Sequence, residues 1–227
     1  MGRVSSPRIR LTLASASPAR LQTLQRAGLE PEVVVSDVDE DAVLVTARER
    51  FGELEPAHMA LLLARAKAED VAFGAPDRRR GDLVLGCDSL LELDGEVHGK
   101  PADADQATAR WRRMRGRSGM LHTGHWLIDV RAPKAGKPRR GVGTVGATAS
   151  TTVHFADLSD AEIAAYVATG EPLRVAGAFT IDGLGGPFVT GIEGDHHNVV
   201  GLSLPLLREL LTDLAVPWTH LLPRSVG

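Results

Sequence analysis

The chain contains one cysteine, Cys87, among its 227 residues. A single thiol cannot form a disulfide within the chain, which excludes a fold stapled by disulfides and predicts a reducing compartment, the cytoplasm. Aromatic residues make up only 4% of the chain, and the net charge is only −3. The basic stretches 78–80 and 134–140 have no interleaved aromatics. These features are not those of a nucleic-acid-binding protein.

Long hydrophobic runs are also missing. No apolar stretch approaches the roughly 18 residues of a membrane span, and residues 11–14 are too few for a secretory signal core. The composition, 43% hydrophobic and 24% charged, is that of an ordinary globular protein. Since there is neither an internal repeat nor a linker-like change in composition, we predict one domain over residues 8–216, with tails at 1–7 and 217–227.

Strands and helices alternate in the hydrophobic pattern. Period-two or continuous apolar runs predict strands, and apolar residues at helical spacing predict helices. The expected strands are residues 8–14, 32–36, 83–85, 120–130, 147–155, 178–182 and 187–193, with a hairpin over 90–99 that turns at Asp94-Gly95. The expected helices are residues 18–27, 56–73, 104–115, 158–168 and 204–214. The pattern predicts a mixed α/β domain, arranged as two lobes around a cleft.

The first strand leads into a candidate anion site. In Ser15-Ala16-Ser17-Pro18-Ala19-Arg20, Ser17 is a typical N-cap and Pro18 is typical of the first helical position. Free backbone N–H groups at a helix start, two hydroxyls and Arg20 together favour a bound phosphate. The alternative is an ordinary capped helix without a ligand.

A carboxylate follows the apolar run 83–85. Gly86 is expected to end that strand, and Asp88 and Ser89 come directly after it. A charge next to a buried strand usually has a partner or a task, although a turn cap is the alternative explanation. Lys67 falls on the inward face of the helix 56–73, where a snorkelling side chain is the alternative, and Lys100 follows the hairpin. With Asp39 and Glu40, these residues could bind a polyphosphate and a divalent cation.

Two other sequence patterns, a glycine motif and two histidine pairs, do not support the nucleotide-binding or metal-binding sites that they suggest. Residues 141–146 match G-x-G-x-x-G, but a basic loop precedes them and a β-prone run follows, so we reject a dinucleotide site. The pairs His122/His125 and His196/His197 lack the spacing and the neighbouring acid of zinc hydrolases.

Taken together and in order, the segments resemble the Maf family of nucleoside triphosphate pyrophosphatases, which shares its fold with inosine-triphosphate pyrophosphatases. The resemblance covers nearly the whole chain. It is carried by LASASPAR at 13–20, Asp39-Glu40, ARAKA at 64–68, GCDS at 86–89, GKP at 99–101, HTG at 122–124, YVATGEP at 166–172, AGAF at 176–179 and GDHHNVVGL at 194–202.

The resemblance implies a mixed, curved sheet flanked by helices, with the active site in a cleft between two lobes. It implies a house-cleaning enzyme that cleaves canonical or modified nucleoside triphosphates between the α and β phosphates, with Mg²⁺ or Mn²⁺ as cofactor, and a homodimer. By the same resemblance, Asp88 is the proton acceptor and, with Glu40, binds the metal. The implied phosphate-binding and catalytic set is Ser15, Ser17, Arg20, Lys67 and Lys100, with Glu40 also assisting catalysis.

The base of the substrate stays open. At the three places where family branches differ, this chain has Ala19, Ser89 and Asp182, which match neither the dTTP/UTP type nor the 7-methyl-GTP type. A hydroxyl at Ser89 favours the first, whereas an acid at Asp182 favours the second. Val175 stands where the family has a lysine, and the neighbouring Arg174 is the candidate replacement.

A nucleotide-binding regulator of septum formation with little turnover is the alternative function. The enzyme is favoured because Asp88, Glu40, Lys67 and Lys100 are all present, and a regulator that only binds has no need of a base.

Overall fold

A computed structural model describes residues 8–74, 81–131 and 143–223 of the chain. Within them, a seven-stranded mixed sheet has the order β2-β1-β3-β5-β6-β7, and β4 pairs with β3. The strands are β1 (Leu11–Ala14), β2 (Glu32–Val33), β3 (Leu83–Leu93), β4 (Glu96–His98), β5 (Ser118–Asp129), β6 (Gly143–Phe155) and β7 (Val189–Glu193). Strand β1 runs parallel to β2 and β3, and the other pairs are antiparallel. The predicted fold class is confirmed.

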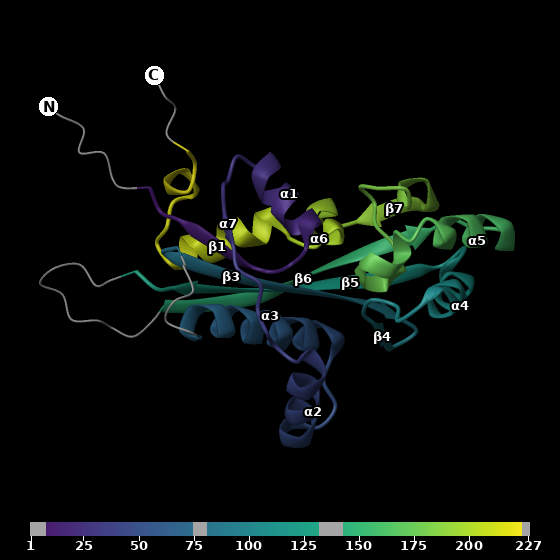
Figure 1. Cartoon of the computed structure of the whole chain (residues 1–227), viewed down its shortest axis with the longest axis horizontal. Helices are drawn as coiled ribbons and strands as arrows, with labels where there is room; N and C mark the ends of the chain where they lie inside the picture. Colours follow the sequence, from purple (N-terminus) through teal and green to yellow (C-terminus); the bar gives the residue numbers. More distant parts are fainter. Residues whose placement is uncertain (1–7, 75–80, 132–142, 224–227) are drawn as a thin grey trace, which may run out of the picture.

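Helices cover both faces of this sheet (Figure 1). They are α1 (Pro18–Arg26), α2 (Glu40–Phe51), α3 (Pro56–Phe73), α4 (Ala104–Met114), α5 (Asp160–Ala168), α6 (His196–Val200) and α7 (Leu204–Asp213). In Figure 1, α1, α6 and α7 lie on one face, while α3 lies on the other with α2 projecting beyond it. Short 3-10 helices span Pro172–Arg174, Ala176–Ala178, Gly186–Phe188 and Trp218–His220. None of the helices in these ranges is long and apolar enough to cross a membrane.

The buried side chains form separate apolar clusters around the sheet. One joins α1 and α7 to β1, β3 and β5 through leucines such as Leu13, Leu24 and Leu207. A second centres on Trp111 of α4 and includes Phe155 and Tyr166, whose rings meet the indole edge to face. Burial of such apolar surface is the main driving force for folding, and here it fastens α4 and α5 to the far end of the sheet.

Two strand glycines allow α3 to lie against the sheet. A Cβ at Gly86 of β3 would lie 2.1 Å from the carbonyl oxygen of Ala64, and one at Gly124 of β5 would lie 2.2 Å from that of Ala60. Both obstacles are helix backbone, which cannot rotate away as a side chain can. Small residues at these positions therefore set the distance between α3 and the sheet.

The structure changes several predicted elements. The strand expected to end at residue 85 continues to Leu93, so Asp88 lies in the middle of β3. Helix α2 was not predicted, because Ala42-Val43-Leu44-Val45 lacks a helical period; Asp39 caps its first turn by accepting from Ala42 N at 3.0 Å. The chain also continues to pack beyond residue 216, since Leu221 is 2% exposed in the core where a tail was expected.

The strand predicted over 178–182 is wrong. Gly177 and Ala178 both have positive φ angles, which belong to a tight turn. The carbonyl of Ala178 accepts from Trp111 Nε1 at 2.9 Å, so a side chain holds this segment in place of a neighbouring strand. Of the residues in the rejected 141–146 motif, those from 143 onward lie in β6; 141 and 142 lie outside the described residues.

We expect Gly124→Ala to lower the free energy of unfolding by about 1–3 kcal/mol or more, because the added methyl group overlaps the α3 backbone. Chemical denaturation with urea measures this loss. Gly99→Ala is the control, since a Cβ added there would meet no described atom within 4 Å and its φ is not positive. Equal stability of the two variants would contradict close packing of α3.

Candidate active site

The site lies at a stretch of β3 where one edge has no neighbouring strand among the described residues. The β1 pairing ends at Ala14 opposite Gly86, and the β4 pairing begins at His98 opposite Leu91. Within the described ranges, residues 87–90 pair with β5 on the other edge only. A gap in the edge of a sheet leaves backbone groups and side chains open to a ligand, as at the switch points of other α/β sheets. Asp88 and Ser89 lie in this gap.

The guanidinium of Arg20 fills part of the gap. Arg20 is 8% exposed and donates to Cys87 O at 2.8 Å, to Ser89 Oγ at 3.0 Å, to Ser15 Oγ at 3.0 Å and to Gly201 O at 2.8 Å. Four of its five N–H donors therefore have protein partners. The side chain joins β3, the loop before α1 and the turn after α6, and it supplies a fixed positive charge in the wall of the site.

The start of α1 presents two hydroxyls. Ser15 Oγ accepts from Ser17 N at 3.2 Å as well as from Arg20, and Ser17 Oγ accepts from Arg20 N at 3.4 Å as the N-cap. Because both oxygens are acceptors in these bonds, their O–H hydrogens remain available to an anion. The predicted cap at Ser17 is confirmed.

Lys67 of α3 lies between two carboxylates. Its Nζ is 2.5 Å from Asp88 Oδ1 and 2.6 Å from Glu40 Oε1. Burial raises the pKa of Asp88 above its ordinary value, and the positive charges of Lys67 and Arg20 oppose this rise. Asp88 is almost fully buried, whereas half of the Glu40 side chain is exposed. An ion pair of this kind keeps a buried carboxylate usable as a base.

Lys100 is exposed at the opposite side of the gap, in the loop that follows β4. The carbonyl of Gly99 accepts from Gly177 N at 3.0 Å and from Arg110 Nη1 at 2.6 Å. These bonds anchor the loop next to Lys100 to α4 and to the 3-10 turn at 176–178. The lysine side chain itself stays free to move toward a ligand.

Asp182 and Ser89 differ in how open they are. Asp182 is exposed, and its Oδ1 accepts from Thr180 Oγ1 at 2.5 Å. Ser89 is buried, with its Oγ 2.9 Å from Thr123 Oγ1; since Thr123 donates to Asn198 O, Ser89 donates to Thr123. The Ser89 hydroxyl is thus engaged as donor to Thr123 and as acceptor from Arg20, whereas the Asp182 carboxylate faces open space.

All these groups line one open cleft of about 1290 Å³. The structure brings together most of the site residues predicted from the sequence: Ser15, Ser17, Ala19, Arg20, Glu40, Lys67, Asp88, Ser89, Lys100 and Asp182. The other carboxylate predicted for this site, that of Asp39, does not line the cleft and instead caps α2. Lining residues that were not predicted from the sequence include Gln22, Arg48, Glu171 and Thr180. Arg48 was missed together with helix α2, although the capping residue Asp39 and the helix-ending Gly52 were available signals.

The residues present suit a hard divalent cation. Glu40 and Asp88 offer carboxylate oxygens, the ligands that Mg²⁺ and Mn²⁺ prefer, and both approach the same ammonium nitrogen. Lys67 takes the position between them, so a cation at this point would share or displace its contacts. No nitrogen or sulfur ligand is needed for this chemistry.

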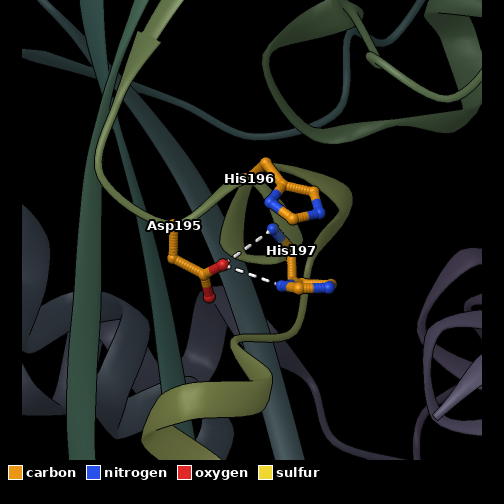
Figure 2. A group of neighbouring side chains, drawn as sticks. All are labelled: Asp195, His196 and His197. Carbon is orange, nitrogen blue, oxygen red and sulfur yellow. Dashed lines mark hydrogen bonds and ion pairs between the residues drawn. The ribbon is translucent and has the colours of Figure 1, made fainter.

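A second group of ligand atoms lies at the start of α6. Atoms of Asp195, His196 and His197 lie within 4.8 Å of one another (Figure 2). Asp195 Oδ1, however, accepts from His197 N at 3.0 Å and lies 2.9 Å from His197 Nδ1. The carboxylate therefore caps the helix and orients His197.

The fold and the cleft define a mixed α/β protein whose ligand site opens at a gap in the sheet edge. The chain belongs to the Maf-like protein family, whose model matches residues 10–214. A nucleoside triphosphate pyrophosphatase of Salinispora tropica is 58% identical over 220 residues, which are 96% of this chain and 90% of the relative. Relatives with the same name are 56% identical in Streptomyces coelicolor, covering 95% of each chain, and 54% identical in Leifsonia xyli, covering 96% and 98%.

We expect Arg20→Lys to destabilise the protein by about 1–3 kcal/mol, because lysine cannot reach all four acceptors and leaves buried oxygens unpaired. Urea unfolding measures the change. The matched control is Arg26→Lys on the same helix, where the side chain is exposed. Equal effects at the two positions would contradict the wall-forming role of Arg20.

Proposed function

We propose that the protein is a nucleoside triphosphate pyrophosphatase, which converts a nucleoside triphosphate and water into the nucleoside monophosphate and pyrophosphate. The observation that carries this proposal is the buried carboxylate of Asp88, held by Lys67 in a cleft that also contains a helix start with donor hydroxyls. The names of relatives more than 50% identical support the same activity. A house-cleaning role follows if the preferred substrates are modified or unwanted nucleotides.

In the proposed reaction, a water oxygen bonds to the α-phosphorus and the bond from that phosphorus to the α–β bridging oxygen breaks. Pyrophosphate leaves with the bridging oxygen, and Asp88 takes the proton from the water. Lys67 leaves its contacts with Glu40 and Asp88 to face the phosphates, while Lys100 approaches from the opposite side. Phosphoryl transfer depends mainly on such positioning and on stabilisation of charge.

The start of α1 would hold the triphosphate through the hydroxyls of Ser15 and Ser17. Arg20 has one N–H left for a phosphate oxygen, so its main contribution is a fixed positive charge and the placement of Ser15 and Ser89. Glu40 would assist Asp88 and, with it, hold Mg²⁺ or Mn²⁺. When bound, the cation would neutralise charge on the phosphate oxygens.

We also infer that the base is recognised by Ala19, Ser89 and Asp182, that the protein acts in the cytoplasm and that it forms a homodimer. Asp182 is an exposed hydrogen-bond acceptor, whereas Ala19 leaves room where a longer side chain would stand. Arg174, exposed at the cleft, supplies positive charge beside Val175. The cytoplasmic setting agrees with the single buried thiol of Cys87, whose pKa burial raises to about 12.

We expect Asp88→Asn to lower kcat by about 10²–10⁴-fold, because an amide cannot accept the proton from the water. Pyrophosphate release is measured over a panel of canonical and modified nucleoside triphosphates with Mg²⁺ or Mn²⁺. Asp213→Asn, at an exposed position of α7 outside the cleft, is the control. Full activity of Asp88→Asn would refute its role as the base, and no turnover by the wild type would refute the function.

Removal of divalent cations by EDTA should abolish pyrophosphate release, and excess Mg²⁺ or Mn²⁺ should restore it, because carboxylates and phosphates would otherwise repel one another in the cleft. Isothermal titration with Mn²⁺ alone checks binding independently of turnover. Glu40→Gln should weaken this binding. Turnover that persists in EDTA would contradict the metal requirement.

A further inference from the structure

Residues 182–184 form one wall of the cleft, and the segment 182–186 belongs to no helix or strand until Gly186. It contributes Asp182 and Leu184, and the Leu184 side chain is 60% exposed. An exposed large apolar side chain next to an acceptor carboxylate suits a flat ring with apolar faces and polar edges. A nucleotide base has these features. How accurately Asp182 and Leu184 are positioned depends on the contacts that hold the segment 182–186.

The carboxylate of Glu171 holds the segment 182–186 through backbone hydrogen bonds. Its Oε2 accepts from Leu184 N at 2.8 Å, and its Oε1 accepts from Gly185 N at 2.8 Å and from Tyr166 Oη at 2.8 Å. Bonds to an ionised acceptor are stronger than those between neutral groups. One carboxylate thus fixes two consecutive backbone amides of the segment and ties them to α5.

The position of Glu171 follows from the end of α5. Gly170, with φ +74°, reverses the chain directly after the helix, and Thr169 Oγ1 accepts from Glu171 N at 3.2 Å. Tyr166, one turn earlier in the helix, packs against the rings of Trp111 and Phe188. The Glu171 carboxylate is therefore hydrogen-bonded to a tyrosine of the aromatic core cluster, and through this bond the cluster restrains the wall of the cleft.

The glycines of the segment are required by this contact. A Cβ at Gly183 would lie 2.3 Å from Glu171 Oε2, and one at Gly185 would lie 2.3 Å from Tyr166 Oη. Neither glycine has a positive φ angle, so the backbone conformation itself would accept alanine. The close approach to Glu171 and Tyr166 explains why residues without side chains stand here.

We propose that Glu171 is a positioning residue for substrate selection, which fixes residues 182–186 so that Leu184 and Asp182 meet the base of the bound nucleotide. The inference rests on the proposed function, since it assigns the base end of that cleft. The carboxylate of Glu171 bonds to Tyr166 and to the 182–186 segment, whereas Asp88 bonds to Lys67, so the phosphate chemistry should depend on Glu171 only weakly.

The test compares the wild type with Glu171→Gln. The amide keeps the size of the side chain but turns an NH₂ group toward a backbone N–H, so at least one of the three bonds is lost. Hydrogen exchange at the amides of Leu184 and Gly185 should become roughly tenfold faster or more. KM for the preferred nucleotide should rise roughly tenfold, with kcat changed by less than about threefold, and discrimination among bases should fall.

Gly183→Ala provides a second test that does not alter the carboxylate. Its methyl group should push the segment away from Glu171 and reproduce the KM increase. In the Glu171→Ala background the obstructing side chain is gone, so Gly183→Ala should raise KM little further. The effects of the two substitutions on KM should therefore be strongly non-additive. Glu209→Gln, exposed on α7, is the matched control and should change none of these quantities.

Each measurement can overturn the inference. If hydrogen exchange at the Leu184 and Gly185 amides is unchanged in Glu171→Gln, Glu171 does not fix the segment 182–186. Faster exchange with unchanged KM and unchanged base discrimination would refute the role in selection, as would additive effects of Gly183→Ala and Glu171→Ala. If the wild type releases no pyrophosphate, the proposed function fails separately. Hydrogen exchange then still tests whether Glu171 fixes the segment 182–186. The affinities of wild type and Glu171→Gln for α,β-methylene triphosphates with different bases test its role in substrate selection.

Discussion

The buried guanidinium of Arg20 is the contact on which the site depends. Among the described strands, β3 has no partner along residues 87–90 on one edge, and an open edge leaves carbonyl groups unsatisfied. Arg20 satisfies the carbonyl of Cys87 and at the same time holds Ser15, Ser89 and Gly201. A planar group with five donors can do this, whereas a strand would close the gap and remove the cleft.

The charges of the cleft depend on one another. A buried Asp88 would be costly alone, because burial disfavours its ionised form. Lys67 offsets that cost and is shared with Glu40, so one ammonium group lies between two carboxylates. Charged groups close to one another thus form the part of the cleft around Asp88, whereas hydrogen bonds from the Leu184 and Gly185 backbone amides to Glu171 hold the segment that contains Asp182.

Local signals predicted part of the fold well. Helix α3 over Pro56–Phe73, the hairpin turn at Asp94-Gly95 and the N-cap at Ser17 are confirmed, because each depends on short-range periodicity, backbone angles or capping. Local signals gave wrong predictions where contacts between distant residues determine the secondary structure. Gly86 is typical of the end of a strand, but it is needed for close packing against α3, and β3 continues past it. Residues 178–182 are β-prone, yet the segment begins in a turn at Gly177 and Ala178, where the carbonyl of Ala178 accepts from Trp111 Nε1.

The sequence by itself determined the mixed α/β class, the capped start of α1 and the types of residue that line the cleft, because these follow from periodicity, capping and side-chain chemistry. Only the tertiary structure decided that ten residues from widely separated segments line one cleft. It also decided that Arg20 has four protein partners and that Glu171 holds the opposite wall. Hydrogen bonds between residues far apart in the sequence, from 13 positions for Glu171 to 181 for Arg20, leave no local pattern, so only the folded chain shows them.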